Sequence, residues 1–254
     1  MDQIYIPKNR VGLGVGDYVE IKPIGANLQD EERERKLYFY KIKYLEPIKL
    51  DIINRVIEII DEEIKNDNII IAGSFLDKGF EFADLDIVVL CNANIDDKHI
   101  DEVLEKKIGI KTHVVIINNS ALIVGLSSDP LYQMMLSKCV AKNRFIYRIK
   151  KKIDYKILDL HLLKSKVLMQ NYDVLNGREK YYFTRNMVAI YLFLHSKRID
   201  REKVEKEIKD IFNLNDIDGI RLNMLDKESF LKRYKEIYNK TFDKIMENIK
   251  DGAK

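Results

Sequence analysis

The segment GSFLDKGFEFADLDIVVL, residues 73–90, contains residues whose spacing could do chemistry. Asp84 and Asp86 stand one residue apart where an apolar run begins. In a strand, positions i and i+2 point to the same face, so two carboxylates there repel unless a cation, a proton or water compensates them. Mg²⁺ fits this role because it binds one or two carboxylates and completes its shell with phosphate oxygens and water. The spacing therefore predicts Asp84 and Asp86 as ligands of Mg²⁺ in chemistry on a phosphate.

The turn before these aspartates offers groups that could hold the phosphate. Gly73 ends an apolar run and lets the backbone approach a ligand closely, while Ser74 supplies a hydroxyl and an N–H. Lys78 follows four residues later and could add a positive charge, although an exposed loop lysine is an equally good interpretation. Gly73, Ser74 and Lys78 are therefore the predicted phosphate-binding residues, and they are the predicted nucleotide-binding residues if the resemblance described next holds.

The pair of motifs GSFLDKG and DLDIVVL resembles the DNA polymerase β-like nucleotidyltransferase superfamily, and especially its minimal, aminoglycoside-type branch. The signature of that branch is Gly-Ser, a spacer, and Asp-x-Asp on a strand; here nine residues separate Ser74 from Asp84. The resemblance covers roughly residues 48–120. It implies that Asp84 and Asp86 hold Mg²⁺ bound to a nucleoside triphosphate, whose phosphates lie against Gly73 and Ser74. A hydroxyl acceptor then attacks the α-phosphate and releases pyrophosphate.

The sequence departs from this family at its third carboxylate. That position, on a neighbouring strand, corresponds to His113 within IKTHVVII, and no Asp or Glu lies between Gly109 and Asn118. The third carboxylate usually helps to activate the attacking hydroxyl. His113 could replace it as a general base, because imidazole titrates near neutral pH. It could equally be a structural histidine, or mark a domain that binds a nucleotide without transferring it.

The patterns around the motifs predict an α/β (α+β) protein in three segments. We expect residues 1–46 to form a short N-terminal β-hairpin and a further strand. Residues 47–150 should form a small mixed β-sheet with flanking helices, and residues 151–254 should form a helical domain. The middle segment is the expected nucleotidyltransferase domain. We expect strands at 36–45, 68–75, 85–90 and 110–117, and helices at 47–65, 95–109, 154–170, 181–196, 201–212 and 228–250.

Charge is distributed unevenly along the chain. Residues 138–185 hold thirteen Lys or Arg and four Asp or Glu, although the net charge of the whole chain is only +3. This asymmetry favours a polyanionic partner, with a solvated helix face as the alternative. The aromatic residues Tyr181, Tyr182 and Phe183 in this segment could stack on a base, but core packing is the simpler expectation.

Composition excludes several other classes of protein. The first ten residues lack the pattern of a signal peptide, and no stretch approaches the ~18 apolar residues of a membrane span, so we expect a cytoplasmic protein without a membrane partner. Cys91 and Cys139 lack the spacing of a zinc site or a disulfide framework.

Three hypotheses follow. The first is a nucleotidyltransferase acting on a small molecule, a protein or an RNA end. The second is a degenerate member of that fold that binds a nucleotide or a partner and acts as a regulator. The third is a nucleic-acid-binding module that uses residues 138–185 and the N-terminal hairpin, whose IPKNR and GLGVGDYVEI stretches loosely resemble the swapped-hairpin DNA-binding fold of the AbrB type.

Overall fold

The structure is a computed structural model that describes residues 36–93, 95–147, 149–197 and 199–252. These residues belong to one compact unit. The predicted N-terminal β-hairpin lies outside the described residues. Within them, no helix is both long enough and apolar enough to cross a membrane.

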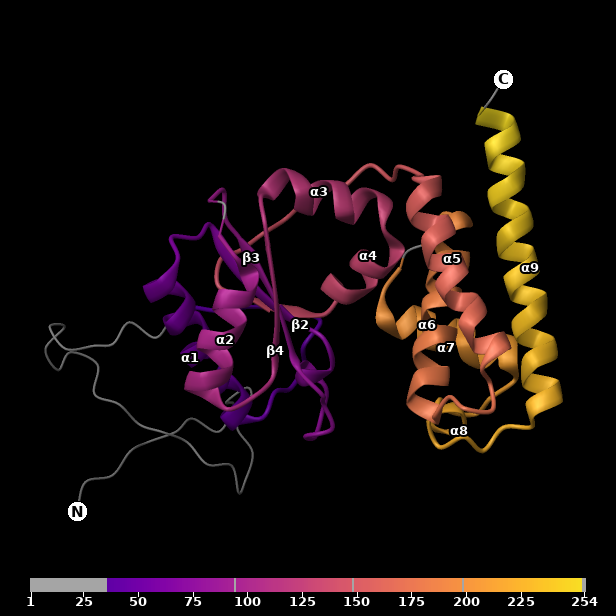
Figure 1. The fold of residues 1–254 in the computed structure, drawn as a ribbon, viewed down its shortest axis with the longest axis horizontal. Coiled ribbons are helices and arrows are strands. Elements are labelled where there is room, and N and C mark those ends of the chain that lie inside the picture. The colour runs from indigo at the N-terminus through magenta and orange to yellow at the C-terminus, as the bar shows by residue number, and fades with distance from the viewer. Residues whose placement is uncertain (1–35, 94, 148, 198, 253–254) are drawn as a thin grey trace, which may run out of the picture. The chain divides into compact units, whose positions relative to one another are not determined.

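The described strands form one mixed sheet (Figure 1). Their order across the sheet is β1-β5-β2-β3-β4. β3 and β4 are parallel, whereas the other neighbouring pairs are antiparallel. Because β2 and β3 run in opposite directions and β4 runs with β3, the end of β2 lies beside the beginnings of β3 and β4. The strands are β1 (Tyr38–Tyr40), β2 (Asn68–Ala72), β3 (Leu85–Leu90), β4 (Thr112–Ile117) and β5 (Cys139–Ala141).

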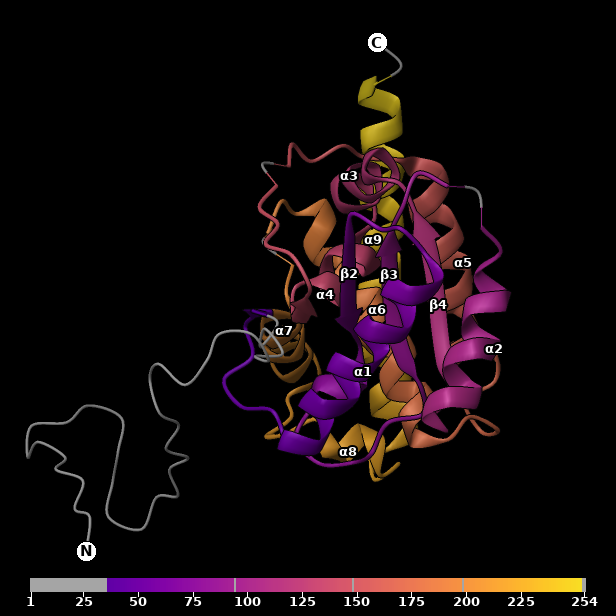
Figure 2. The same cartoon turned by 90° about the vertical axis from the view of Figure 1, so that its left-hand side faces the viewer.

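Helices cover both faces of this sheet. The buried residues of α1 (Pro47–Glu63) and α2 (Asp97–Ile108) form a core with one face, and Figure 2 shows both helices on that side. On the other face, α3 (Asn119–Ser128) and α4 (Pro130–Leu136) contribute to a separate core. Asp86 projects toward this second face, because strand residues alternate and its neighbour Val88 belongs to the second core.

Local sequence explains where several of these helices begin and end. Pro47 occupies the first turn of α1, where its missing N–H costs nothing. The Asp96 side chain accepts a hydrogen bond from the Lys98 N–H at the start of α2, and Gly109 ends that helix in a left-handed conformation. α2 confirms the helix predicted at 95–109. The prediction was possible because the signals that begin and end this helix lie within the segment itself.

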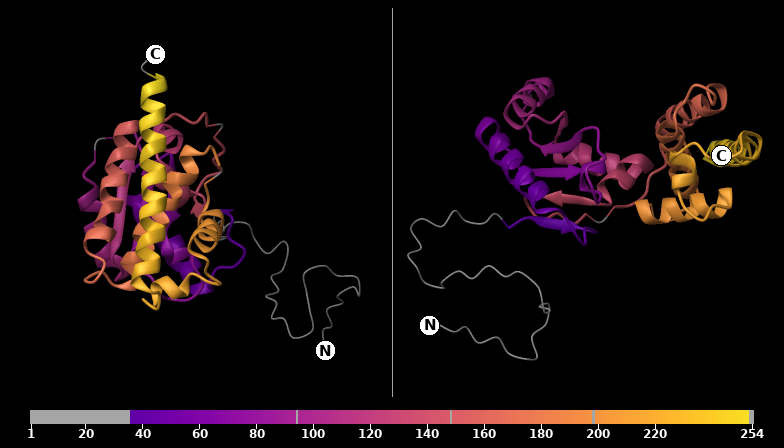
Figure 3. Two further views of the ribbon diagram at one scale, coloured as in Figure 1. Left: turned by 90° about the vertical axis from the view of Figure 1, so that its right-hand side faces the viewer. Right: turned by 90° about the horizontal axis from the view of Figure 1, so that it is seen from below.

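The C-terminal half has its own apolar core. Figure 1 shows α5, α6 and α9 side by side, and Figure 3 shows α9 lying along its neighbours. Met134 of α4 packs into this core, so α4 joins it to the sheet. The elements are α5 (Tyr155–Gln170), α6 (Gly177–Leu194), α7 (Arg201–Phe212), α8 (Asp218–Arg221) and α9 (Lys227–Gly252).

The observed class, a small mixed sheet with flanking helices followed by a helical region, confirms the predicted fold class. The sequence patterns missed α3, α4, α8 and β5, and they extended the first strand well beyond Tyr38–Tyr40.

Candidate functional site

The sheet brings four of the predicted site residues to one end. Gly73 directly follows β2, and Ala72 pairs with Asp86 of β3. On its other side Asp86 pairs with His113 of β4. Ser74 begins a short 3₁₀ turn, Ser74–Leu76, immediately after Gly73. Residues 40 positions apart in the sequence therefore face a common space.

Gly73 makes the close approach at this end of the sheet possible. Its φ angle is +83°, a backbone conformation that residues other than glycine rarely adopt. A Cβ atom added to Gly73 would lie 2.1 Å from Asp86 Oδ2. Both its backbone conformation and the position of Asp86 therefore require glycine here.

Asp86 is a partly buried carboxylate in an unfavourable environment. Burial raises its pKa, and the nearby negative charge of Asp84 raises it further. His113 opposes these effects from the adjacent strand, with Nδ1 3.4 Å from Asp86 Oδ1. Arg185 of α6 adds a weaker, attractive charge. The two oxygens of Asp86 thus face different neighbours, Oδ1 toward His113 and Oδ2 toward Gly73.

These groups open into a cavity of about 430 Å³, here called the sheet-end cavity. Gly73, Ser74, Asp86 and His113 line it from the sheet. Met134 and other side chains of α4 supply an apolar wall, and α6 contributes polar and charged residues. A cavity of this size and mixed character is suited to a small polar ligand.

The other two predicted site residues lie differently. Asp84 is half-buried and acts on Asp86 through its charge, but it is not among the residues that line the sheet-end cavity. Lys78 is exposed and lines a second, larger cavity next to Ser74. The sequence therefore predicted the centre of the site better than its edges.

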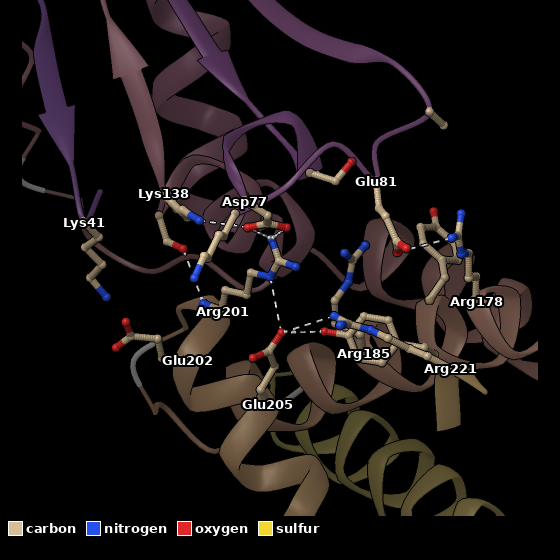
Figure 4. Close-up of a pocket in the computed structure, with 16 residues that line it drawn as sticks. Lys41, Asp77, Glu81, Lys138, Arg178, Arg185, Arg201, Glu202, Glu205 and Arg221 are labelled. Atoms are coloured by element: carbon tan, nitrogen blue, oxygen red, sulfur yellow. Dashed lines mark hydrogen bonds and ion pairs between the residues drawn. The ribbon is translucent and has the colours of Figure 1, made fainter. Parts of the chain in front are cut away.

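The second cavity, here called the basic cavity, has a volume of about 680 Å³ (Figure 4). Seven Lys or Arg and four Asp or Glu line it. It adjoins the sheet-end cavity, because five residues line both: Ser74, Lys138, Tyr182, Arg185 and Arg201. All but Ser74 are functional candidates that the motif analysis did not assign to the site.

Asp77 organises the cations shared by the two cavities. Lys138 Nζ lies 2.8 Å from Asp77 Oδ1, and Arg201 Nη1 lies 2.6 Å from Asp77 Oδ2 (Figure 4). Burial alone would raise the pKa of Asp77, but these two cations hold it below its ordinary value. Lys138 directly precedes β5 and Arg201 begins α7, so this ion-pair cluster connects three distant segments.

Arg185 is the least compensated of these cations. Its Nε atom is buried without a hydrogen-bond partner among the described residues, and its Nη2 donates a long hydrogen bond to Asn186 Oδ1 at 3.4 Å. Its guanidinium carbon lies 5.2 Å from the ring centre of Tyr182. Burial lowers the pKa of Arg185. A buried cation with spare donors is a binding site for an anion.

The interpretation of Tyr182 as a core residue is wrong. Its side chain is 49% exposed and lines both cavities, whereas Tyr181 is buried and donates a hydrogen bond to Glu205. The signal that could have found Tyr182 and Arg185 was present in the basic segment 138–185. No sequence pattern indicated Arg201, because its partner Asp77 is 124 residues away.

Lys49 of α1 holds the loop that carries Ser74 and Lys78. Its side chain is fully buried, and its ammonium donates hydrogen bonds to the carbonyl oxygens of Asp77 and Gly79. Glu46 Oε2 lies 3.2 Å from the same nitrogen, and Glu46 Oε1 accepts a bond from the Gly79 N–H. A buried lysine is stable only with such partners, so it fixes the loop firmly.

Among the described residues, no three or more His, Cys, Asp or Glu side chains form a group that could hold a metal ion. No family model, curated protein or solved structure matches this chain. The nucleotidyltransferase resemblance therefore rests on the residues themselves.

Proposed function

We propose that the chain is a Mg²⁺-dependent nucleotidyltransferase. It transfers a nucleoside monophosphate from a nucleoside triphosphate to a hydroxyl acceptor and releases pyrophosphate. The observation that carries this proposal is Asp86, a carboxylate kept beside Asp84 at an energetic cost. Gly73 lies against one of its oxygens, and the nearby Arg185 has a buried Nε without a hydrogen-bond partner among the described residues. Such a cost is typical of residues retained for binding or catalysis.

The donor set is compatible with Mg²⁺. This ion is commonly bound by one or two carboxylates together with phosphate oxygens and water, so it does not need three protein ligands. Asp86 and Asp84 would hold it, and when bound it neutralises charge on the triphosphate. A cation bound beside Asp86 would oppose the burial and the negative charge of Asp84 that raise the pKa of this carboxylate.

The protein's own residues would position the substrates. The backbone at Gly73 lets phosphate oxygens come close, and the hydroxyl and N–H of Ser74 donate hydrogen bonds to them. Arg185 offers its spare donors to the same charge. His113, oriented through Nδ1 by Asp86, leaves its Nε2 to accept the proton of the acceptor hydroxyl. The acceptor oxygen then bonds to the α-phosphorus as the bond to pyrophosphate breaks.

Pyrophosphate release tests this proposal. Purified protein is incubated with Mg²⁺ and each of the four ribonucleoside triphosphates, with total cellular RNA and protein as acceptors. We expect turnover to fall at least ~100-fold in Asp84→Asn and Asp86→Asn. Asp51→Asn, which removes an exposed carboxylate from α1, should leave it unchanged. Full turnover in Asp86→Asn would contradict the proposal.

Thermal unfolding separates this loss from misfolding. The raised pKa of Asp86 means that its ionised form is less favourable in the folded than in the unfolded state. That stability cost is absent below the ordinary pKa and develops as the pH rises through the raised one. At neutral pH, Asp86→Asn should therefore melt at or above the temperature of the unmodified protein.

One observation favours a second candidate function. His113 lies next to Asp86, at the position that corresponds to the third carboxylate of the family that this sequence resembles. In this alternative the protein binds a nucleotide with Mg²⁺, releases no pyrophosphate, and acts as a regulator. Calorimetry would then detect binding without turnover, and His113→Asp would create pyrophosphate release. Turnover by the unmodified protein would exclude this alternative.

A further inference from the structure

The acceptor, which the proposed function leaves open, is constrained by a row of adjoining cavities. The basic cavity shares Lys41 and Ser137 with a third cavity, also about 680 Å³ in volume. This third space is called the aromatic cavity after Tyr40, Phe145 and Tyr147 in its lining. The basic cavity therefore adjoins both the sheet-end cavity with Asp86 and His113 and the aromatic cavity with these rings. A row of three spaces is longer than a small acceptor requires.

The charge along this row favours a polyanion. In the basic cavity, cations outnumber carboxylates, and the single carboxylate of Asp77 lies between Lys138 and Arg201. Arg185, at the junction with the sheet-end cavity, has no carboxylate within ion-pair distance among the described residues, and its Nε has no partner. The aromatic cavity adds Lys151 and Lys197 to the cationic lining, and its carboxylate, Asp200, pairs with Lys41 at 2.8 Å.

Aromatic side chains lie toward both ends of this row. Tyr182 is half exposed and has the Arg185 guanidinium near its ring at the junction. In the aromatic cavity, the ring centres of Tyr40 and Phe145 are 4.6 Å apart, and those of Phe145 and Tyr147 are 5.7 Å apart. Neighbouring Ile146 is 71% exposed. Cations that follow a backbone and aromatic rings that stack on bases are the combination that binds single-stranded nucleic acids.

We propose that the acceptor is the 3′ end of a single-stranded nucleic acid. The inference rests on the proposed transferase function, since it identifies the second substrate of the same site. The terminal 3′ hydroxyl reaches Asp86 and His113, and the last phosphates lie against Lys138 and Arg201, which line both the sheet-end and the basic cavity. Upstream nucleotides pass through the basic cavity toward Tyr40 and Phe145. The hydroxyl loses its proton, its oxygen bonds to the α-phosphorus, and pyrophosphate leaves, so the strand grows by one nucleotide.

Fluorescence anisotropy with labelled oligonucleotides of about ten nucleotides tests this inference. The probes are one RNA sequence and its DNA counterpart, so the measurement shows whether the site prefers RNA or DNA as the single strand. We expect affinity to fall at least ~10-fold between about 50 and about 200 mM salt, because bound phosphates release counterions. Tyr182→Ala should weaken binding roughly tenfold through lost stacking.

Substitutions of two exposed cations test whether the strand occupies both the basic and the aromatic cavity. Arg178→Ala removes a charge from the basic cavity, and Lys197→Ala removes one from the aromatic cavity. Each should weaken oligonucleotide binding and reduce the salt slope by about one. Binding of Mg²⁺ and nucleotide should be unaffected by both. The matched control is Arg55→Ala, which removes an exposed arginine from α1 and should change neither measurement.

Product analysis completes the test. With labelled nucleoside triphosphate, a 3′-hydroxyl oligonucleotide should gain one or more nucleotides, and a 3′-phosphate oligonucleotide should gain none. Label that appears on protein or a small molecule while the oligonucleotide stays unchanged would overturn the inference and leave the transferase intact. Equal oligonucleotide affinity in all variants would also overturn it. Oligonucleotide binding without any nucleotide binding would retain the strand site and contradict the proposed function.

Discussion

At the scale of single residues, the candidate site depends on a carboxylate and a glycine that constrain each other. Asp86 reaches its position only because Gly73 presents no side chain to it. In this arrangement Asp86 Oδ2 lies against Gly73, whereas Oδ1 faces His113. Any atom placed between these residues must either move the carboxylate or strain the turn.

A pair of glycine substitutions measures this constraint. Gly73→Ala introduces a left-handed alanine and a contact of 2.1 Å with Asp86, whereas Gly79→Ala has nearly the same φ, +85°, and meets nothing within 4 Å. Gly79→Ala should therefore lose about 1–2 kcal/mol of stability from backbone strain alone. Gly73→Ala should lose more, and it should also lose Mg²⁺-dependent nucleotide binding. Urea unfolding and calorimetry would measure both effects; equal losses in the two variants would contradict a role for the Asp86 contact.

At the scale of elements, the loop between β2 and β3 carries most of the site, and α1 holds it in place. Lys49 of α1 makes the contacts that hold this loop. The ring centres of Phe75, Phe80 and Phe82 all lie within 6 Å of its ammonium. Its remaining partners are backbone carbonyls and Glu46, so it acts as an internal fastener of the loop rather than as a ligand-binding group.

Lys49→Met tests the fastening of this loop. The substitution retains an apolar stem but leaves two carbonyl oxygens and the Glu46 carboxylate without their cation. We expect a loss of about 3 kcal/mol in the free energy of unfolding, measured in urea. Lys107→Met is the matched control, because its partly exposed ammonium lies 3.5 Å from Glu63 and should contribute less than ~0.5 kcal/mol. A similar small loss in both variants would show that the loop is held by other contacts.

Sequence patterns predicted those elements whose signals are local. α2 carries its own N-cap and a glycine C-cap, and β3 is a clear apolar run between turn residues. By contrast, α3 contains a block of apolar residues without helical alternation, and β5 has three residues that become a strand only by pairing with β1 and β2. Their conformations are set by tertiary contacts, which a single sequence does not display.

The same distinction applies to the candidate site. Gly73, Ser74 and Asp86 were predictable because they lie close together in one motif. The match of His113 with Asp86 required the parallel pairing of β3 and β4, which the order of elements indicated and the register fixes. Arg201 lies 124 residues after Asp77 in the sequence, and its place at the site depends on its ion pair with that residue. Long-range ion pairs of this kind leave no periodicity in the sequence.

At the scale of the whole described unit, the site lies where residues from two cores meet. The sheet supplies Asp86 and His113, and the helical half supplies Arg185 and Arg201. α4 takes part in both cores, with Leu136 packed on the sheet and Met134 in the helical core. The ionic connection is Asp77, whose two cationic partners come from the start of β5 and from α7 (Figure 4).

The pH dependence of stability should reveal this connection. Because Lys138 and Arg201 lower the pKa of Asp77, the ionised form stabilises the fold above the ordinary pKa of 3.8. That contribution disappears as the pH falls through the lowered pKa. Asp77→Asn should cost about 1–3 kcal/mol at pH ~7, since the neutral amide loses charge-assisted bonds to two cations. The difference between variant and unmodified protein should then shrink below pH ~4.

Urea unfolding at several pH values would measure this difference, with Glu81→Gln as the control. Glu81 pairs with Arg178 at 3.3 Å, but their side chains are 86% and 76% exposed, so solvent screens the pair. The control should change stability by less than ~0.5 kcal/mol at every pH. A difference for Asp77→Asn that stayed constant down to pH ~3 would mean that the loss came from packing. A difference that vanished with falling pH would identify the charge of Asp77 as the link between the sheet and α7.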